Sequence, residues 1–190
     1  MLIYSTIEMP RLFYAIDLPE ELKAELIPVV SSLGKLGRHV RPVGAGGFHL
    51  TLLFLGEQPD EVVEDFRLFG GQVTEGARAS RAEIGEAGFF PRVSFLTLEG
   101  ELDTIFVIAD VLKTLCTGYL ERPDDRPFKL HITLARHKQN ISGTEKEFIK
   151  KQTAKFKGRS WEIDRLILFE SKLTPKGAVY TEQGVFKFGG

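Results

Sequence analysis

FHLTLLFLG, at Phe48–Gly56, is matched further along the chain by LHITLARHK, at Leu130–Lys138. Both segments contain an apolar residue, a histidine, an apolar residue, a threonine and a leucine in that order, and their starts are 82 residues apart. A pattern of this length rarely recurs by chance in 190 residues that contain only four histidines. A short internal duplication is the better explanation.

The alternation in both segments is typical of strands with one polar face. Because residues i and i+2 of a strand project from the same side, His49 and Thr51 share one face, and His131 and Thr133 share another. The apolar residue between them points to the opposite side, into a core. If the two strands face one another, two imidazoles and two hydroxyls converge on a cleft.

Two histidines suit a reaction that takes up one proton and releases another near neutral pH, because imidazole titrates near pH ~6.5. Phosphodiester hydrolysis is such a reaction: water loses a proton as it attacks phosphorus, and the departing sugar oxygen gains one. Threonine hydroxyls can donate hydrogen bonds to the non-bridging oxygens, where negative charge accumulates in the transition state.

Two other interpretations of the histidines compete with this one. A zinc site would lack ligands, because the nearest acidic residues, Glu57 and Asp125, are expected outside the two strands. We therefore expect no metal and no cofactor. Alternatively, each histidine is merely a hydrogen-bonded strand residue, an explanation that fits one copy better than a matched pair.

Several other polar residues accompany the two segments. Strict alternation places Arg136 on the face opposite His131, so only a bulge or the end of the strand would aim it at the cleft, and spacing alone favours a surface arginine. His39 and His137 lie outside the repeat and are expected to be exposed. Three cations precede a glycine-rich turn, where they either contact a polyanion or are simply solvated: Lys35, Arg38 and Arg41.

The composition, 43% hydrophobic and 27% charged, is that of a globular protein with one domain or two small lobes. No apolar run approaches the ~18 residues that span a bilayer, and the N-terminus lacks a secretion signal, so we expect no membrane association. The single cysteine, Cys116, cannot form an internal disulfide and is expected to be a small buried hydrophobe, which suits a reducing cytoplasm.

The net charge of −1 hides an asymmetry along the chain. Residues 1–125 contain 11 Lys and Arg against 20 Asp and Glu, whereas residues 126–190 contain 14 against 6. The basic part could meet an anionic substrate. Much of its excess, however, has the spacing of a solvated helix face: Lys146, Lys150, Lys151, Lys155 and Lys157.

Strand and helix patterns are interspersed, which predicts an α+β chain. Helices are expected from Pro19 to Gly34 and at 61–69, 102–119 and 145–156, and strands at 11–17, 48–55, 81–90, 93–99, 128–135, 161–171 and 179–188. The polar loop ERPDDRP follows the third helix. A complete strand and helix could begin at Met9, so Met1–Glu8 is an N-terminal extension or a misassigned start.

At these residues the sequence resembles the 2H phosphoesterase superfamily, and most closely the RNA 2',3'-cyclic phosphodiesterases, formerly called 2'-5' RNA ligases. The resemblance runs from about Met9 to Phe188 through RLFYAIDLPEEL, HLTLLFLGE, HITLAR and LILFESKLTPKGAVYTEQGVFKF. Two HxT motifs with these flanks form a specific signature. Two departures are Leu130, where many relatives have proline, and RVSFLTLEG, where relatives often have a tryptophan-containing strand.

The resemblance implies a single bilobal domain over residues 1–190, with two pseudo-symmetric lobes of antiparallel sheet and outer helices around a central cleft. It implies metal-independent opening of a terminal 2',3'-cyclic phosphate to a 2'-phosphate. His49 is then the proton donor to the leaving 3'-oxygen and His131 the proton acceptor that activates water. Thr51, Thr133 and Arg136 bind the phosphate.

The partner implied by the resemblance is RNA with a 2',3'-cyclic phosphate end, tRNA fragments included, and the protein is expected to act as a monomer. Three alternatives stay open: hydrolysis of small cyclic nucleotide phosphates, joining of RNA halves through a 2'-5' bond, and a non-catalytic RNA- or nucleotide-binding module on the same fold. The presence of all four motif residues argues against the last, because a binding module needs neither an acid nor a base.

Overall fold

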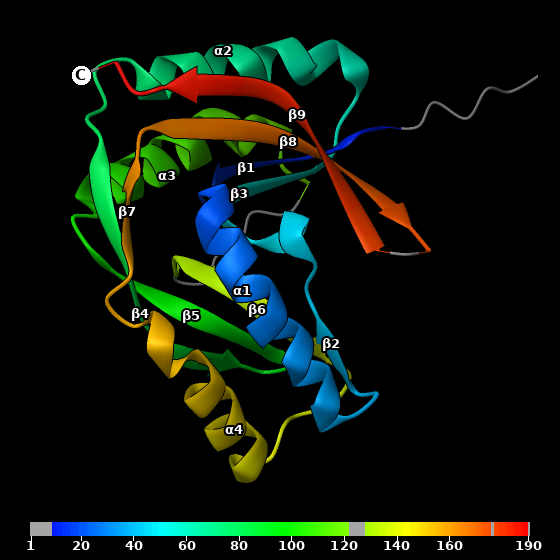
Figure 1. Ribbon diagram of the computed structural model, residues 1–190. Helices are drawn as coiled ribbons and strands as arrows, with labels where there is room; N and C mark the ends of the chain where they lie inside the picture. Colours follow the sequence, from blue (N-terminus) through cyan, green and yellow to red (C-terminus); the bar gives the residue numbers. More distant parts are fainter. Residues whose placement is uncertain (1–8, 122–127, 176, 190) are drawn as a thin grey trace, which may run out of the picture.

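The computed structural model describes residues 9–121, 128–175 and 177–189, and it has an α+β fold built on two antiparallel sheets (Figure 1). This architecture confirms the class predicted from the sequence. Met1–Glu8, predicted to be an N-terminal extension or a misassigned start, and residues 122–127 of the predicted ERPDDRP loop lie outside the described residues.

Each sheet contains one of the two histidine–threonine strands. The four-stranded sheet has the order β3-β1-β8-β9 and the five-stranded sheet the order β2-β6-β5-β4-β7. The first comprises β1 (Arg11–Asp17), β3 (His49–Glu57), β8 (Arg165–Thr174) and β9 (Gly177–Lys187). The second comprises β2 (Val40–Pro42), β4 (Ser80–Phe90), β5 (Val93–Gly100), β6 (His131–His137) and β7 (Ser160–Ile163).

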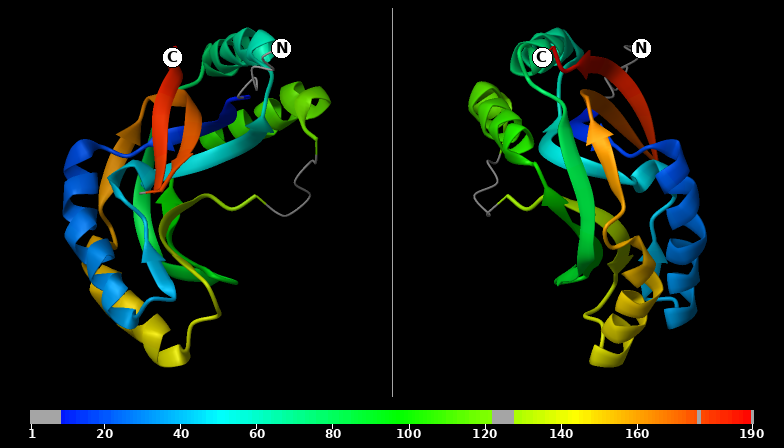
Figure 2. Two further views of the ribbon diagram at one scale, coloured as in Figure 1. Left: turned by 90° about the vertical axis from the view of Figure 1, so that its right-hand side faces the viewer. Right: turned by 60° about the vertical axis from the view of Figure 1, so that its left-hand side comes forward.

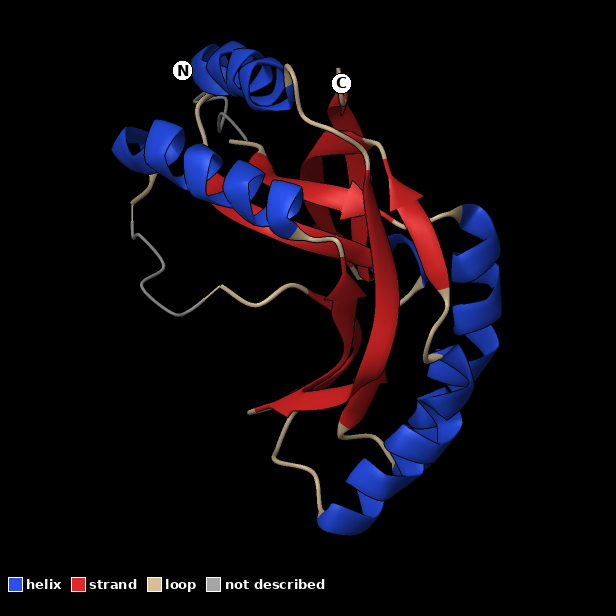
Figure 3. Ribbon diagram, turned by 90° about the vertical axis from the view of Figure 1, so that its left-hand side faces the viewer, coloured by secondary structure: helices blue, strands red, loops and turns tan. Residues whose placement is uncertain are grey.

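The helices lie on the outside of the sheets, as Figure 2 and Figure 3 show. They are α1 (Glu20–Ser32), α2 (Val63–Thr74), α3 (Asp103–Cys116) and α4 (Gly143–Thr153). Helices α2 and α3 contact each other and pack against the four-stranded sheet, whereas α4 packs against β4. No helix in the described ranges is long and apolar enough to cross a membrane.

The central strand β1 is buried on both faces, and the two faces belong to different layers. Leu12, Tyr14 and Ile16 point into the main hydrophobic core, which the helices cover. Phe13 and Ala15 point to the other side, into a small separate apolar cluster. The sheet therefore has one face free of the main core, and this face carries the candidate site.

Two strand predictions need correction, and one strand was missed. The single strand expected at Trp161–Ser171 is wrong, because the chain breaks at Asp164 into β7 and β8, which belong to different sheets. The strand expected at 128–135 begins only at His131 and extends to His137. The three-residue strand β2 was not predicted at all, since a strand so short and ending in proline has no visible alternation.

The expectation of exposed histidines outside the repeat is wrong for His137. It lies opposite Val40 on the core side of β6, is 6% exposed, and neither ring nitrogen has a hydrogen-bond partner in the described part of the chain. Burial lowers its pKa. His39 is half-buried, with Nε2 2.7 Å from Oε1 of Glu145.

The structure also bears on the expected structural roles of Cys116 and of the lysines near α4. Cys116 is buried in α3, and burial raises the pKa of its thiol to about 12, so it is a core residue rather than a nucleophile. Four of the five lysines of the predicted solvated face are exposed, Lys150, Lys151, Lys155 and Lys157, whereas Lys146 is half-buried with its Nζ 5.6 Å from the centroid of the Phe89 ring.

Candidate active site

Both motif strands contain a bulge at the same place in the motif. In the β1–β3 pair, Ala15 lies opposite Thr51 and Tyr14 opposite Leu53, so Leu52 is left unpaired. In the β5–β6 pair the register likewise skips one residue immediately after the threonine, so the leucine that follows Thr133 is unpaired. The leucine of each histidine–x–threonine–leucine motif is therefore the extra residue of a bulge.

The bulge reverses the alternation that follows it and thereby turns Arg136 toward the site. Along β6, His131 and Thr133 are half-buried and Arg136 is exposed, whereas Ile132 and Leu134 are buried. All three polar side chains thus lie on one face. From the spacing alone, Arg136 could point at the cleft only if the strand contained a bulge or ended there, and β6 contains such a bulge.

The corresponding position in the first motif holds an aromatic residue. Phe54 follows His49 at the same spacing as Arg136 follows His131, and it is 64% exposed. It lies opposite Phe13, with ring centroids 5.8 Å apart, on the face that carries His49. The two motifs therefore differ at this position: the second motif has a cation, Arg136, and the first has an aromatic ring, Phe54.

The two motif strands approach each other although they belong to different sheets. Strands β3 and β6 contain residue pairs whose Cα atoms lie within 8 Å. Arg136 of β6 acts electrostatically on both motif histidines, His49 and His131. The fold thus brings the predicted histidines and the arginine into one electrostatic neighbourhood.

His49 is held by its ring nitrogen and by aromatic neighbours. Its Nδ1 lies 3.2 Å from the backbone carbonyl of Gly46, and since a carbonyl can only accept, Nδ1 carries the hydrogen. The rings of Phe13, at 5.0 Å between centroids, and Tyr180, at 5.2 Å, pack against the imidazole. Within the described residues Nε2 has no hydrogen-bond partner.

His131 is held in the same way by the other sheet. Its Nδ1 lies 2.6 Å from the backbone carbonyl of Lys129, and the rings of Phe95 and Phe90 pack at 5.1 and 5.3 Å. The two histidines therefore share one arrangement: a backbone carbonyl fixes the tautomer, with the hydrogen on Nδ1, and aromatic rings fix the plane of the imidazole.

The surroundings lower the pKa of both imidazoles. Burial is the main cause for each, because it disfavours the charged form, and the guanidinium of Arg136 lowers both values further. The carbonyl of Gly46 and the carboxylate of Asp17 oppose this effect at His49. The neutral form of each histidine is therefore favoured in the free enzyme.

Thr51 and Thr133 are half-buried beside the histidines, and neither hydroxyl donates or accepts a hydrogen bond within the described residues. Each is therefore available to a ligand. Asp17, opposite His49 on β1, is instead engaged by Lys23, whose Nζ lies 2.6 Å from its Oδ2.

The donor set offers little to a metal ion. Across the described ranges no three His, Cys, Asp or Glu side chains gather at ligating distance. Glu57, expected outside the strands, is the last residue of β3. Metal independence stays a prediction.

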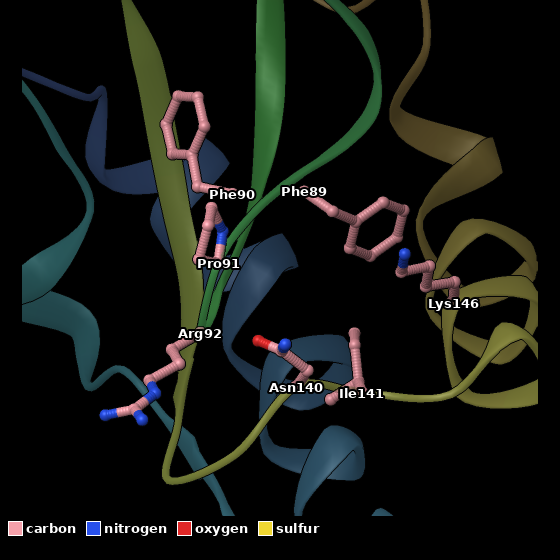
Figure 4. A pocket seen from close by; sticks show the side chains of 7 residues that line it. All are labelled: Phe89, Phe90, Pro91, Arg92, Asn140, Ile141 and Lys146. Carbon is pink, nitrogen blue, oxygen red and sulfur yellow. The ribbon is translucent and has the colours of Figure 1, made fainter. Parts of the chain in front are cut away.

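The aromatic rings around the histidines were not predicted as part of the site. The apolar run RLFYAID gives no indication that Phe13 faces away from the core, and Tyr180 comes from the distant strand β9. A pocket of about 250 Å³ lies beside Phe90, one of the two rings that pack on His131. The other residues that line it are Phe89, Pro91, Arg92, Asn140, Ile141 and Lys146 (Figure 4).

Comparison with known proteins identifies relatives along nearly the whole chain. The family model described as LigT like Phosphoesterase matches residues 16–94 and 97–180, one histidine–threonine motif in each part. A protein named RNA 2',3'-cyclic phosphodiesterase from Thermus thermophilus is 34% identical over 95% of this chain and 91% of its own. A protein of the same name from Archaeoglobus fulgidus is 29% identical over 93% of this chain and 99% of its own.

Solved structures of related proteins have the same fold. A crystal structure of a Thermus thermophilus protein superposes with a TM-score of 0.77 at 33% identity, covering 95% of this chain and 98% of its own. The Escherichia coli LigT structure complexed with 3'-AMP has a TM-score of 0.74 at 25% identity, covering 95% and 99%.

Proposed function

The chain belongs to the LigT-like phosphoesterase family, and from that membership and the geometry of the site we propose that it is an RNA 2',3'-cyclic phosphodiesterase. It opens a terminal 2',3'-cyclic phosphate to a 2'-phosphate. One observation carries the proposal: two imidazoles on facing strands, both fixed at Nδ1, share one cationic neighbour in Arg136.

The phosphate binds between the two strands. The Arg136 guanidinium and the hydroxyls of Thr51 and Thr133 contact its non-bridging oxygens, which gain negative charge as water attacks phosphorus. These three groups lie on the faces that carry the histidines, and both hydroxyls have no other partner in the described part of the chain.

The histidines divide the proton transfers between them. Nε2 of His131 takes a proton from water as the oxygen attacks phosphorus, and the bond from phosphorus to the 3'-oxygen breaks. Nε2 of His49, protonated at the start, gives its proton to that oxygen. The products are a 2'-phosphate and a 3'-hydroxyl. At the end His131 is protonated and His49 is neutral. His131 must then release a proton to solvent, and His49 must take one up from solvent, before the next cycle.

The experiment is hydrolysis of an oligoribonucleotide that ends in a 2',3'-cyclic phosphate, in the presence of EDTA. We expect the unaltered protein to turn over. His49→Ala and His131→Ala should each lose at least ~10²-fold, the scale of general acid or base catalysis. His39→Ala, a histidine paired with Glu145 outside the site, should retain activity.

A protein that binds the oligonucleotide without hydrolysing it would be a binding module, and the proposal would be wrong. Activity that disappears in EDTA and returns with added metal would refute the metal-independent mechanism.

A further inference from the structure

Arg41 lies directly beside Arg136 on the site face of the five-stranded sheet. Strand β2 pairs with β6 so that Arg41 is opposite Arg136, while the next pair, Val40 and His137, is buried. Directly opposed residues of antiparallel strands project from the same face. The two arginines are both exposed and therefore stand next to each other in front of that sheet.

This arrangement is unfavourable unless an anion is present. Like charges directly opposite each other destabilise a strand pair. Within the described part of the chain, neither Arg41 nor Arg136 forms an ion pair with a carboxylate. Two adjacent unpaired guanidiniums indicate a binding place for more negative charge than the protein supplies.

A third arginine lies at the same end of the sheet. Arg92, in the β4–β5 turn, precedes Val93, which pairs with Arg136 from the other side, and its backbone carbonyl accepts a hydrogen bond from the N–H of His137 at 2.8 Å. Its φ of 61° is left-handed, a conformation in which glycine or asparagine would be less strained. Figure 4 shows its side chain turned away from Phe89 and Lys146.

The cyclic phosphate alone does not account for this charge. It carries one negative charge, and Arg136, two threonine hydroxyls and an imidazolium already surround its place in the proposed function. Arg41 stands on the edge strand β2, one strand beyond β6, so it is positioned for a second phosphate further along the ligand.

We infer, on the basis of the proposed function, that Arg41 binds the phosphodiester that joins the terminal nucleotide to its 5' neighbour. Arg92, at the same end of the sheet, adds a third positive charge to this region. The preferred substrate is then an oligoribonucleotide rather than a cyclic mononucleotide, because only the former has a phosphate at this position.

The test compares Arg41→Gln with the unaltered protein on two substrates: a trinucleotide and a mononucleotide, each ending in a 2',3'-cyclic phosphate. On the trinucleotide we expect kcat/KM to fall roughly tenfold, mainly through KM, as for a lost charge-assisted hydrogen bond. On the mononucleotide we expect no change. Lys151→Gln removes the same charge from the exposed face of α4 and should leave both rates unaltered.

A chemical change in the substrate makes the assignment specific. A trinucleotide whose last internucleotide linkage is a neutral methylphosphonate should lose the same factor with the unaltered protein, and Arg41→Gln should cost it nothing more. The slope of log kcat/KM against log salt on the normal trinucleotide should become shallower by about 0.7 in Arg41→Gln.

Equal losses on mononucleotide and trinucleotide would overturn the inference, since Arg41 would then act on the cyclic phosphate itself or on the fold. An unchanged rate on both would overturn it as well. Failure of the unaltered protein to hydrolyse either substrate would instead refute the proposed function.

Discussion

Each imidazole of the site is fixed by a backbone carbonyl shortly before its strand, that of Gly46 for His49 and that of Lys129 for His131. Because Nδ1 donates in both cases, the nitrogen available to the substrate is Nε2 in both. The same residue can then serve as acid or base according to its protonation alone. The division of roles must come from the orientation of the substrate rather than from different tautomers.

The lowered pKa of both histidines determines the expected pH dependence. In the proposed mechanism the reactive free enzyme has one histidine protonated and the other neutral, so kcat/KM should be bell-shaped, with apparent pKa values that belong to the pair. Since burial and Arg136 lower both values from 6.5, the maximum should lie below pH 6.5. In kcat, the bound phosphate stabilises the imidazolium, and the curve should shift to higher pH.

Arg136→Gln should move the kcat/KM maximum to higher pH, because it removes a cation that lowers the pKa of both histidines. Both profiles can be recorded between about pH 4 and 9 on a cyclic-phosphate substrate. A maximum of kcat/KM above pH 6.5 in the unaltered protein would contradict the desolvated histidine pair.

The sequence predicted individual residues where a motif is repeated. It did not predict a residue's burial or direction where these depend on a neighbouring strand or a bulge. The duplicated motif indicated His49 and His131. The burial of His137 follows from its pairing with Val40 of β2, a strand too short to recognise. The aim of Arg136 follows from a bulge, which alternation alone cannot reveal.

At the scale of elements, the duplication extends to backbone irregularity. Both motif strands place a bulge at the leucine after the threonine, and each bulge turns the residue two positions further on toward the site. The strand prediction at 161–171 failed for a related reason. The apolar pattern continues through Asp164, so nothing in it signals that the chain passes from one sheet to the other.

Helix α4 offers a prediction that separates stability from catalysis. Ser142 and Glu145 form a capping box: the Ser142 hydroxyl accepts from the Glu145 N–H at 3.2 Å, and the Glu145 carboxylate accepts from the Ser142 N–H at 2.7 Å. Ser142→Ala should lower the free energy of unfolding by ~1 kcal/mol, measured by urea denaturation. The kcat/KM should not change, because the cap side chains bond each other and His39 rather than any residue proposed to bind the phosphate.

Thr144→Ala is the matched control for the cap. It removes an exposed hydroxyl from the same helical turn and should alter the free energy of unfolding by less than ~0.5 kcal/mol. If the two variants were equally destabilised, or if Ser142→Ala lost activity, the capping account of α4 would be wrong.

At the scale of the molecule, one continuous core joins the two sheets. It includes Leu50 of β3, Ile132 of β6 and Ile84 of β4, together with residues of all four helices. The chain also crosses between the sheets four times, from β1 to β2, from β2 to β3, from β3 to β4 and from β7 to β8. We therefore propose that the two lobes form a single domain.

A single domain should unfold in one cooperative step. Trp161, the only tryptophan, lies buried in β7 of the five-stranded sheet, so its fluorescence reports on that sheet, whereas far-ultraviolet circular dichroism reports on the whole chain. In urea the two signals should change with the same midpoint. Two separate midpoints would show that the lobes unfold independently.

The central claim is that His49 and His131 act from opposite sides of one phosphorus atom. The most direct measurement is the identity of the product formed from an oligoribonucleotide with a 2',3'-cyclic phosphate end, determined by phosphorus NMR after reaction in EDTA. If His49 protonates the 3'-oxygen while His131 activates water, the phosphate stays on the 2'-oxygen and the product is a 2'-phosphate. A 3'-phosphate would contradict that account, because the substrate would then lie reversed between the two motifs.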